Sequence, residues 1–267
     1  MRPGTVRARA RPDAAAILGL IAGPIFVALA VFILSGYDTA KALAFYSFQA
    51  FILTAGGSLA AVFAAFPLAD AVGGLKCAGL IFQSRGDEAG RTRTRIVRLA
   101  NIARANGVLA LEDAAAGIDD GFLKKGAALV ADGVPQETIM EIMAAERASI
   151  IGKFANGARV WEFMAASASS WGLIGVVIGL VEMLTRMGDP QAVGRGMISA
   201  AASAMYGMII SIFIAKPAAN KIKLLGGREM ALKNMVIDGL LYIRAGEEPR
   251  VIAEKMAARD GYYPSAD

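Results

Sequence analysis

The sequence predicts an all-α integral membrane protein with four transmembrane helices, a helical cytoplasmic domain between the second and third spans, and a helical cytoplasmic tail. Three observations lead to this fold class. Hydrophobic residues make up 56% of the 267 residues and charged residues only 19%, a balance more apolar than that of an ordinary soluble domain. The apolar residues gather in long runs, and the charged residues lie between them. No alternation of polar and apolar residues predicts a β-strand.

Four apolar runs are long enough to cross a bilayer, for which a helix needs roughly 20 apolar residues. They extend from about Ala14 to Ser35, Tyr46 to Phe66, Phe163 to Leu184 and Met197 to Ala215. The first run follows a short arginine-bearing segment, as in a secretory signal peptide. It is longer than the apolar region of a typical signal, and no convincing cleavage site follows it, so we expect a retained membrane anchor.

The basic residues predict the orientation of these spans. Lys41 is the only basic residue between spans one and two, and Arg186 and Arg195 are the only ones between spans three and four. The other lysines and arginines lie in the tail 1–13, the middle segment 67–162 and the tail 216–267, which flank the span pairs 14–66 and 163–215. The positive-inside rule therefore places both termini and the middle segment in the cytoplasm.

The cytoplasmic segments carry helical patterns. Apolar residues recur at helical spacing from Arg91 to Ala115, which predicts one helix. A turn at 132–135 precedes an amphipathic stretch that we expect to continue into the third span. In the tail, we expect Pro217 to end or kink the fourth span, a helix from Arg228 to Ala245, and a last short helix to about Arg259.

Several kinds of chemistry have no support in this composition. The chain has no histidine and one cysteine, Cys77, so imidazole catalysis, an intrachain disulfide and a cysteine-cluster metal site are excluded. Cys77 is expected to be a small packing residue. There is no phosphate-binding glycine loop after a strand and no cluster of catalytic side chains. We therefore expect neither an enzyme nor a cofactor or metal site.

Seven short sequence motifs together resemble those of a known protein family. They are Thr54-Ala55-Gly56-Gly57-Ser58, Gly107-Val108-Leu109-Ala110-Leu111-Glu112, Gly172-Leu173-Ile174-Gly175-Val176-Val177-Ile178-Gly179, Tyr206-Gly207, Lys216-Pro217, Asp238-Gly239-Leu240-Leu241 and Gly246-Glu247-Glu248-Pro249-Arg250. In order and spacing this set resembles the MotA/PomA family of flagellar motor stator subunits, in the MotA/TolQ/ExbB superfamily, over about Ile17 to Met256.

The resemblance implies a complex in the bacterial inner membrane. It would be a pentamer of such chains around a pair of MotB/PomB-type subunits, which contribute a membrane helix with an ion-carrying aspartate and a peptidoglycan-binding domain. Ion passage would drive the ring, whose cytoplasmic domain acts on a rotor switch protein of the FliG type. The predicted spans of this chain hold no aspartate of their own, in keeping with a subunit that forms the wall of the ion path.

The resemblance also implies residues that line the ion path or contact the partner helix. They are Ser169, Gly172, Gly175, Val176, Gly179, Ser203, Ala204, Tyr206 and Gly207. The spacing of Gly175 and Gly179 suits close helix packing, either within this chain or against the partner helix. Ser169 stands where the family usually has proline. Serine bends a helix only mildly, by bonding back to a carbonyl, so we expect this departure to change either the gating detail or the full motor activity.

The transported ion is expected to be H⁺ rather than Na⁺. Sodium-type members usually have threonine where this chain has Val176, and a threonine pair where it has Ser203 and Ala204. Hard cations need oxygen ligands, which valine and alanine do not offer, whereas a proton can travel on a carboxylate and water.

The resemblance assigns a rotor contact to Arg104 and Glu112, with Arg98 widening the basic side. On the predicted helix from Arg91 to Ala115, Arg104 and Glu112 would lie about two turns apart on one face. Complementary charge suits a contact that must form and release quickly. Taken without the resemblance, the same residues are better explained as a solvated charged face.

A second function stays open at this point. Relatives of the ExbB/TolQ type use ion flow for other tasks, but they generally have three spans and a periplasmic N-terminus, unlike the two closely spaced N-terminal spans here. A stator-like unit for gliding or defence is the remaining alternative, and the missing proline at Ser169 is its best support.

Overall fold

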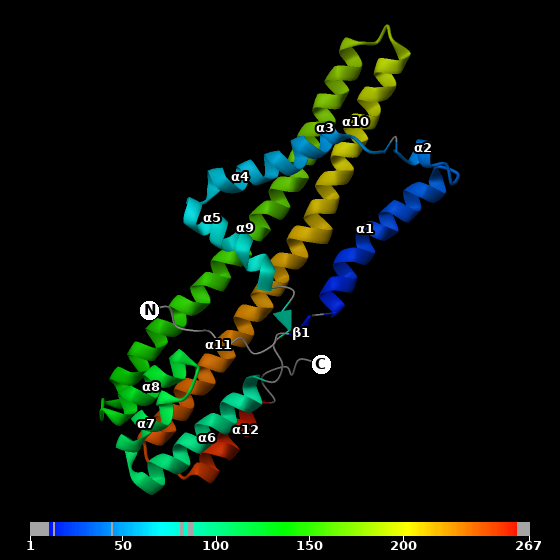
Figure 1. Ribbon diagram of the computed structural model, residues 1–267. Helices are drawn as coiled ribbons and strands as arrows, with labels where there is room; N and C mark the ends of the chain where they lie inside the picture. The colour runs from blue at the N-terminus through cyan, green and yellow to red at the C-terminus, as the bar shows by residue number, and fades with distance from the viewer. Residues whose placement is uncertain (1–10, 13, 44, 81–82, 85–87, 261–267) are drawn as a thin grey trace. The chain divides into compact units, whose positions relative to one another are not determined.

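The computed structural model describes residues 11–12, 14–43, 45–80, 83–84 and 88–260, and these are predominantly helical (Figure 1). The predicted all-α class is confirmed. In this part of the chain the strands β1 (Arg11–Pro12) and β2 (Gln83–Ser84) are only two residues long. The cytoplasmic tail expected at 1–13 lies outside the described residues apart from 11–12.

The chain divides into two compact units. The one we call the apolar unit consists of Pro12–Phe82 and Phe154–Lys223. The one we call the charged unit contains Gln83–Lys153 and Leu224–Asp267. Residues 68–80, which the sequence assigns to the cytoplasmic segment 67–162, thus pack within the apolar unit. Trp161 accounts for part of this packing, because its indole N–H donates to the carbonyl of Gly74 at 3.0 Å.

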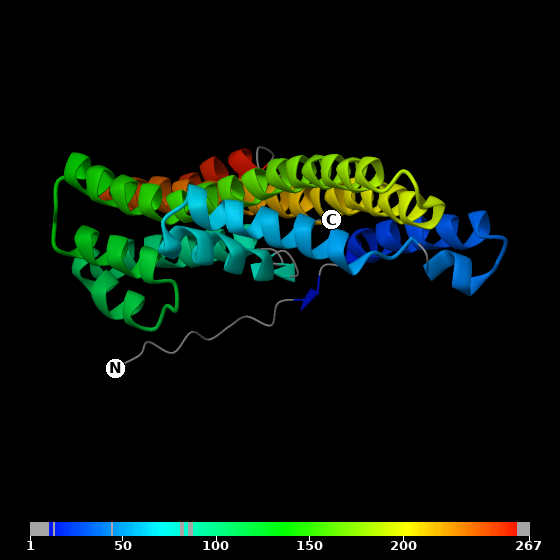
Figure 2. The ribbon, with the colours of Figure 1, turned by 90° about the horizontal axis from the view of Figure 1, so that it is seen from above.

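The apolar unit begins with a series of short helices after one long one. These are α1 (Ala14–Leu34), α2 (Thr39–Leu43), α3 (Phe48–Phe51), the π-helical η1 (Ile52–Gly56), α4 (Gly57–Ala65), α5 (Leu68–Lys76) and the 3₁₀-helical η2 (Cys77–Leu80). The unit continues with part of α9 (Gln136–Thr185), then α10 (Pro190–Ile209), the π-helical η4 (Ile210–Ala215) and the first turns of α11 (Lys216–Arg244). Figures 1 and 2 show α9 and α10 lying side by side.

Three described helices are long and apolar enough to cross a membrane, by length and composition alone. They are Phe48–Ala65 and segments within Gln136–Thr185 and Pro190–Arg244. A shorter apolar stretch, Ile21–Leu34, lies in α1. These segments correspond to the second, third and fourth predicted spans and to most of the first. The count of four and the orientation stay predictions.

The amphipathic stretch after the turn at 132–135 does continue into the third predicted span. α9 is a single helix of 50 residues, from Gln136 to Thr185. At its start, Gly133 takes a φ of +71°, and Arg244 donates to the carbonyls of Gly133 and Val134 at 3.2 and 3.1 Å. The left-handed glycine and the two arginine bonds therefore fix the turn from which α9 starts.

Pro217 does not end the helix that follows α10. The π-helical η4 occupies Ile210–Ala215, and α11 runs on from Lys216 to Arg244, so the helix expected at Arg228 begins twelve residues earlier. Proline has no N–H to donate, and it leaves carbonyls of the preceding turn without their usual partner. Local π adjustment is a recognised way for a membrane helix to accommodate this, and η4 stands directly before the proline.

The single helix expected from Arg91 to Ala115 is wrong. α6 (Glu88–Asn106) ends before Gly107, whose φ of +83° lies in the left-handed region. A 3₁₀ turn, η3 (Val108–Ala110), and a short α7 (Leu111–Ala116) follow. Apolar periodicity runs across this break because both sides pack on one core, and periodicity alone does not reveal a change of helix axis.

The charged unit has one apolar core. It is built by α6, α7, α8 (Gly121–Ala131), the start of α9, the end of α11 and α12 (Pro249–Asp260), the last short helix that the sequence predicts. Its fully buried large side chains include Ile96, Leu99, Leu111, Leu123, Ile139, Met143, Leu240 and Ile252. This core gives the charged helices a stable support.

Candidate functional site

α9 and α10 approach each other along a row of small residues, which we call the small-residue seam. It consists of Ala168, Gly172, Gly175 and Gly179 on α9 and Gly196, Ala200, Ser203 and Gly207 on α10. A Cβ on Gly179 would stand 2.8 Å from the Gly196 carbonyl oxygen and from the backbone nitrogen of Ala200. A Cβ on Gly172 would stand 3.0 Å from the carbonyl oxygen of Ser203. Only glycine permits this approach, so within the chain these residues pack α9 against α10.

Ser203 lies inside this seam. The residue is 1% exposed, and its hydroxyl donates to the carbonyl of Ser199 at 2.9 Å. A Cβ on Gly175 would collide with the Ser203 side chain. The hydroxyl is therefore satisfied within its own helix and enclosed by α9. Val176 and Ala204, the other positions of the ion argument, are half-buried.

Tyr206 connects α10 to the segment that leads into α3. Its hydroxyl accepts from the backbone N–H of Ser47 at 3.1 Å and donates to the carbonyl of Phe45 at 3.3 Å. The ring of Phe51 meets the Tyr206 ring edge to face, with 5.9 Å between centroids. Ser47 in turn caps α3 by accepting from Ala50 N–H. Tyr206 thus fixes the entry of the second predicted span.

Ser169 faces away from the seam and is exposed. Its hydroxyl donates to the carbonyl of Ala165 at 3.4 Å, the backward bond expected of a serine in a helix. α9 stays continuous through this position, so no helix break marks the site where the family carries proline.

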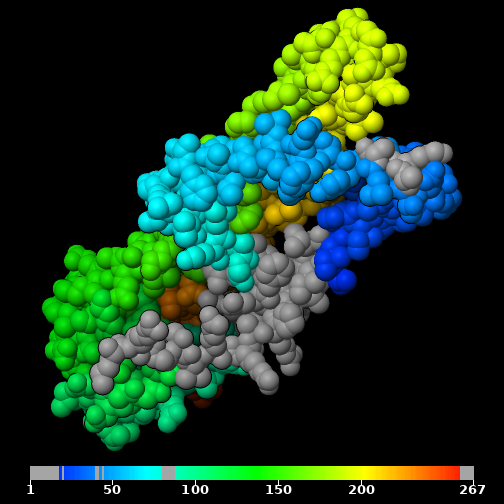
Figure 3. Space-filling view, turned by 45° about the horizontal axis from the view of Figure 1, so that its top comes forward, coloured from blue at the N-terminus to red at the C-terminus, as the bar shows by residue number. Residues whose placement is uncertain are grey.

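The exposed side of α9 around Ser169 is strongly apolar. Leu173, Val177 and Val181 are 66%, 54% and 54% exposed. Figure 3 shows the end of α9 and the start of α10, in yellow-green, standing clear of the light-blue helices of the second predicted span. Side chains there, including Leu184 and Met187, are also more than half exposed. Such a surface requires lipid or another subunit to cover it.

The second predicted span holds two buried hydroxyls that the sequence analysis does not single out. Thr54, in η1, and Ser58, in α4, are both 0% exposed and bond back to the carbonyls of Ala50 and Ala55 at 2.8 and 2.9 Å. Between them, Gly57 receives the ring of Trp171 from α9. The signal was present in the string from Thr54 to Ser58, but only the fold shows that these residues face α9 and α10.

The charged unit carries the residues predicted to contact a rotor. Arg98 and Arg104 lie exposed on α6, and Glu112 lies exposed on α7, beyond the break at Gly107. They do not share one helix face, because the helix argument fails at that break. Glu112 has no ion pair with any described residue, whereas Arg104 pairs with Glu248 at 2.8 Å. Arg98 lines an open pocket on α6 with Thr94, Val97, Asn101, Ile102, Ala105 and Asn106.

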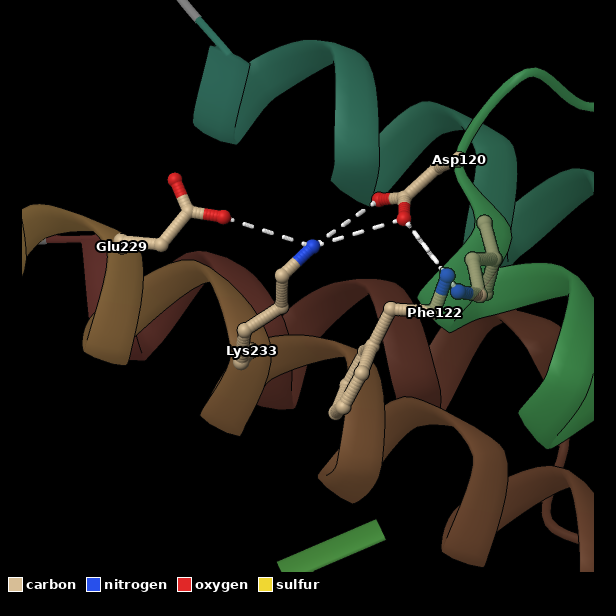
Figure 4. A network of polar contacts seen from close by, with 5 residues as sticks. Asp120, Phe122, Glu229 and Lys233 are labelled. Atoms are coloured by element: carbon tan, nitrogen blue, oxygen red, sulfur yellow. Dashed lines mark hydrogen bonds and ion pairs between the residues drawn. The ribbon is translucent and has the colours of Figure 1, made fainter. Parts of the chain in front are cut away.

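A buried cation holds α8 to α11 in the same unit (Figure 4). Lys233 is 8% exposed, and its ammonium lies 3.4 Å from Asp120 Oδ1 and 3.4 Å from Glu229 Oε1. Asp120 also caps α8 by accepting from the N–H groups of Phe122 and Leu123. The ammonium stands 4.9 Å from the centre of the Phe122 ring. This network has a structural role, because the Lys233 ammonium joins a carboxylate at the start of α8 to one on α11.

Cys77 packs against α9, where a Cβ on Gly157 would lie 3.0 Å from its sulfur. Burial raises the pKa of the Cys77 thiol above its ordinary value. The thiol therefore stays protonated and weakly nucleophilic near neutral pH. Among the residues that the structure describes, no group of three or more histidine, cysteine or acidic side chains could hold a metal ion.

Comparison with known proteins defines the class. The family model for the MotA/TolQ/ExbB proton channel family matches residues 114–235. Chemotaxis protein PomA of Vibrio alginolyticus is 33% identical over 240 residues, which cover 90% of this chain and 92% of PomA. The chain therefore belongs to the MotA/PomA family, as the motif strings predicted.

Solved structures share the fold. A chain of the flagellar MotAB stator complex from Bacillus subtilis matches with a TM-score of 0.81 and 28% identity, over 94% of this chain and 96% of that one. The structure of C. jejuni MotAB matches with a TM-score of 0.84 and 22% identity, over 92% of this chain and 95% of that one. More than nine-tenths of the chain, rather than one domain, is similar to these structures.

Proposed function

We propose that this chain is the A subunit of a flagellar motor stator, which forms an ion channel with a MotB-type partner and converts ion flow into torque on the rotor. The observation that carries this proposal is its similarity to a chain of a flagellar MotAB stator complex over 94% of its own length. The matching family is one of proton channels, and a channel function agrees with the apolar unit. Such a function requires no covalent chemistry from the chain.

The proposed topology has four spans across the inner membrane, with both termini in the cytoplasm. α1, the helices from Phe48 to Ala65, the apolar part of α9, and α10 with η4 would be the spans. The positive-inside distribution of lysine and arginine supports this orientation. The charged unit would then lie in the cytoplasm.

The uncovered apolar side of α9 supports an assembly with other subunits. Leu173 and Val177 are exposed on the same side of α9 as Ser169. The α9 glycines of the small-residue seam already pack against α10. We therefore propose that this exposed side, rather than the seam itself, meets the MotB-type helices or neighbouring A subunits. A pentamer around a pair of B subunits is the proposed stoichiometry.

We propose H⁺ as the coupling ion. Val176 and Ala204 provide no side-chain oxygen, and Ser203, which is 1% exposed, is enclosed between α9 and α10. A sodium ion would have to leave its water without replacement ligands from these positions. A proton needs only a carboxylate on the partner and a short chain of water.

The proposed rotor contact is the exposed surface that contains Arg98, Arg104 and Glu112. The presence of both charge signs on an exposed surface suits a contact that forms quickly and releases quickly. The proposed partner is a rotor switch protein of the FliG type.

Complementation tests the proposal. A strain that lacks its own stator would receive this chain with its B-type partner, and swimming speed would be measured with and without sodium and with a protonophore. We expect motility that ignores sodium and collapses with the protonophore. Sodium-dependent motility would keep the stator function and refute the ion assignment.

Absence of motility with a correctly inserted complex would refute a flagellar role for the chain with serine at position 169. The exposed Ser169, in place of the family proline, favours a stator-like energiser of another process in that case, such as an ExbB/TolQ-type unit or a gliding or defence motor. A Ser169→Pro variant would then show whether the helix break alone restores swimming.

A further inference from the structure

The end of α6 meets the start of α12 on the surface of the charged unit. Ile252 and Met256 of α12 are buried with Ile96 and Leu99 of α6 in the same core. α11 ends at Arg244, Gly246 then takes a φ of +74°, and α12 begins at Pro249. This fold places Glu248 beside Arg104, although 144 residues separate the two in the chain.

Arg104 and Glu248 form a single ion pair. The distance from a guanidinium nitrogen of Arg104 to Glu248 Oε1 is 2.8 Å. Neighbouring Glu247 is already paired with Lys255 at 2.6 Å. Within the described chain, neither Arg104 nor Glu248 has another ionic partner. The intrachain partner of Arg104 is therefore Glu248, and Glu112 stays unpaired.

The pair lies in solvent. The side chains of Arg104 and Glu248 are 56% and 61% exposed. Exposed pairs of this kind contribute little to folding, because water screens both charges. The position of α12 is set by its buried apolar side chains instead. The pair is consequently free to open without disturbing the fold.

We propose that Glu248 is an exchangeable intrachain competitor for Arg104, which a carboxylate of the rotor protein displaces when the two proteins engage. This inference rests on the proposed function and adds a regulating residue to the rotor-contact surface. A guanidinium has five N–H donors, so an incoming carboxylate can bind Arg104 before Glu248 has left. Exchange through such a shared state keeps Arg104 paired with a carboxylate during both binding and release. The contact can then form and release rapidly.

The test is a binding cycle on the complete A–B complex in nanodiscs, titrated with the soluble rotor switch protein. Removal of the competitor by Glu248→Gln is expected to tighten binding about two- to fivefold, the range set by an exposed ion pair. Arg104→Gln should weaken binding, and Glu248→Gln should have no further effect in that background. The matched control is Glu254→Gln, since Glu254 forms an exposed pair on α12 with Arg250 at 3.5 Å and does not pair with Arg104.

The outcomes separate this inference from the function on which it rests. The competition would be refuted if Glu248→Gln weakened binding or left it unchanged. It would also be refuted if Glu248→Gln tightened binding as much in the Arg104→Gln background as in the natural sequence. A complex that drives swimming but never binds the switch protein would refute the contact surface and the inference together. A complex that neither drives swimming nor binds would refute the stator assignment itself.

Discussion

Replacement of Gly179 by alanine measures how tightly α9 is packed against α10. The new methyl group would stand 2.8 Å from the Cβ and nitrogen of Ala200 and 2.8 Å from the carbonyl oxygen of Gly196. Two of these three atoms belong to the backbone, so the strain is relieved only if the helices separate. Gly194, in the same helix pair, is the matched control, because a Cβ there meets no described atom within 4 Å.

The magnitude follows from two opposing terms. Alanine is favoured over glycine inside a helix by about 1 kcal/mol, and both variants gain this amount. Overpacking costs about 1–3 kcal/mol, and only Gly179→Ala incurs it. Gly194→Ala should therefore stabilise the chain slightly. The difference between the two variants should equal the overpacking cost, about 1–3 kcal/mol.

The assay is a comparison of unfolding in detergent, by SDS titration or by thermal midpoint, under identical conditions. We expect Gly179→Ala to unfold well before Gly194→Ala, and the complex that contains it to lose motility. Equal unfolding of the two variants would refute the close approach of α9 and α10. In that case the glycines of α9 would be available to the partner helix.

Three further substitutions test other parts of the structure. Lys233→Met should destabilise the chain by roughly 3 kcal/mol, because two carboxylates lose a largely buried cation. Lys125 forms a more exposed pair with Glu146 at 2.5 Å. Lys125→Met should therefore cost less than about 1 kcal/mol, and losses equal to those of Lys233→Met would contradict the burial argument. Tyr206→Phe should lower the free energy of unfolding by about 1 kcal/mol through the loss of its two backbone bonds; an unchanged value would show that they do not hold the second span. Val176→Thr with Ala204→Thr should introduce sodium dependence into swimming speed, and unaltered sodium response would remove the basis of the proton assignment.

The sequence predicted the presence of the helices better than the residues at which they begin and end. Apolar runs gave the membrane helices, because a bilayer requires long apolar segments whatever their neighbours are. The long course of α9 was also predictable from its amphipathic start. The break at Gly107 was not, since a single glycine is compatible with both a continuous helix and a left-handed turn. Pro217 does not end the helix, because a π-helical turn before it lets the helix continue.

The candidate residues divide in the same way. The spacing of Gly175 and Gly179 predicted close packing, but not which helix would occupy them. Arg104 was identified from the family resemblance, whereas its partner Glu248 was visible only as part of a string far along the chain. The sequence did not indicate that Thr54 is buried, because its burial depends on how η1 packs against other helices.

By itself, the sequence determined that this protein is a helical membrane protein and that its strings resemble those of stator subunits. These properties depend on local composition and on the order of short motifs. Only the tertiary structure decided that α10 fills the glycines of α9, that Tyr206 holds the entry of α3, and that Glu248 neutralises Arg104. Each of these contacts joins residues far apart in the chain, and their distances depend on how the helices pack rather than on any local pattern.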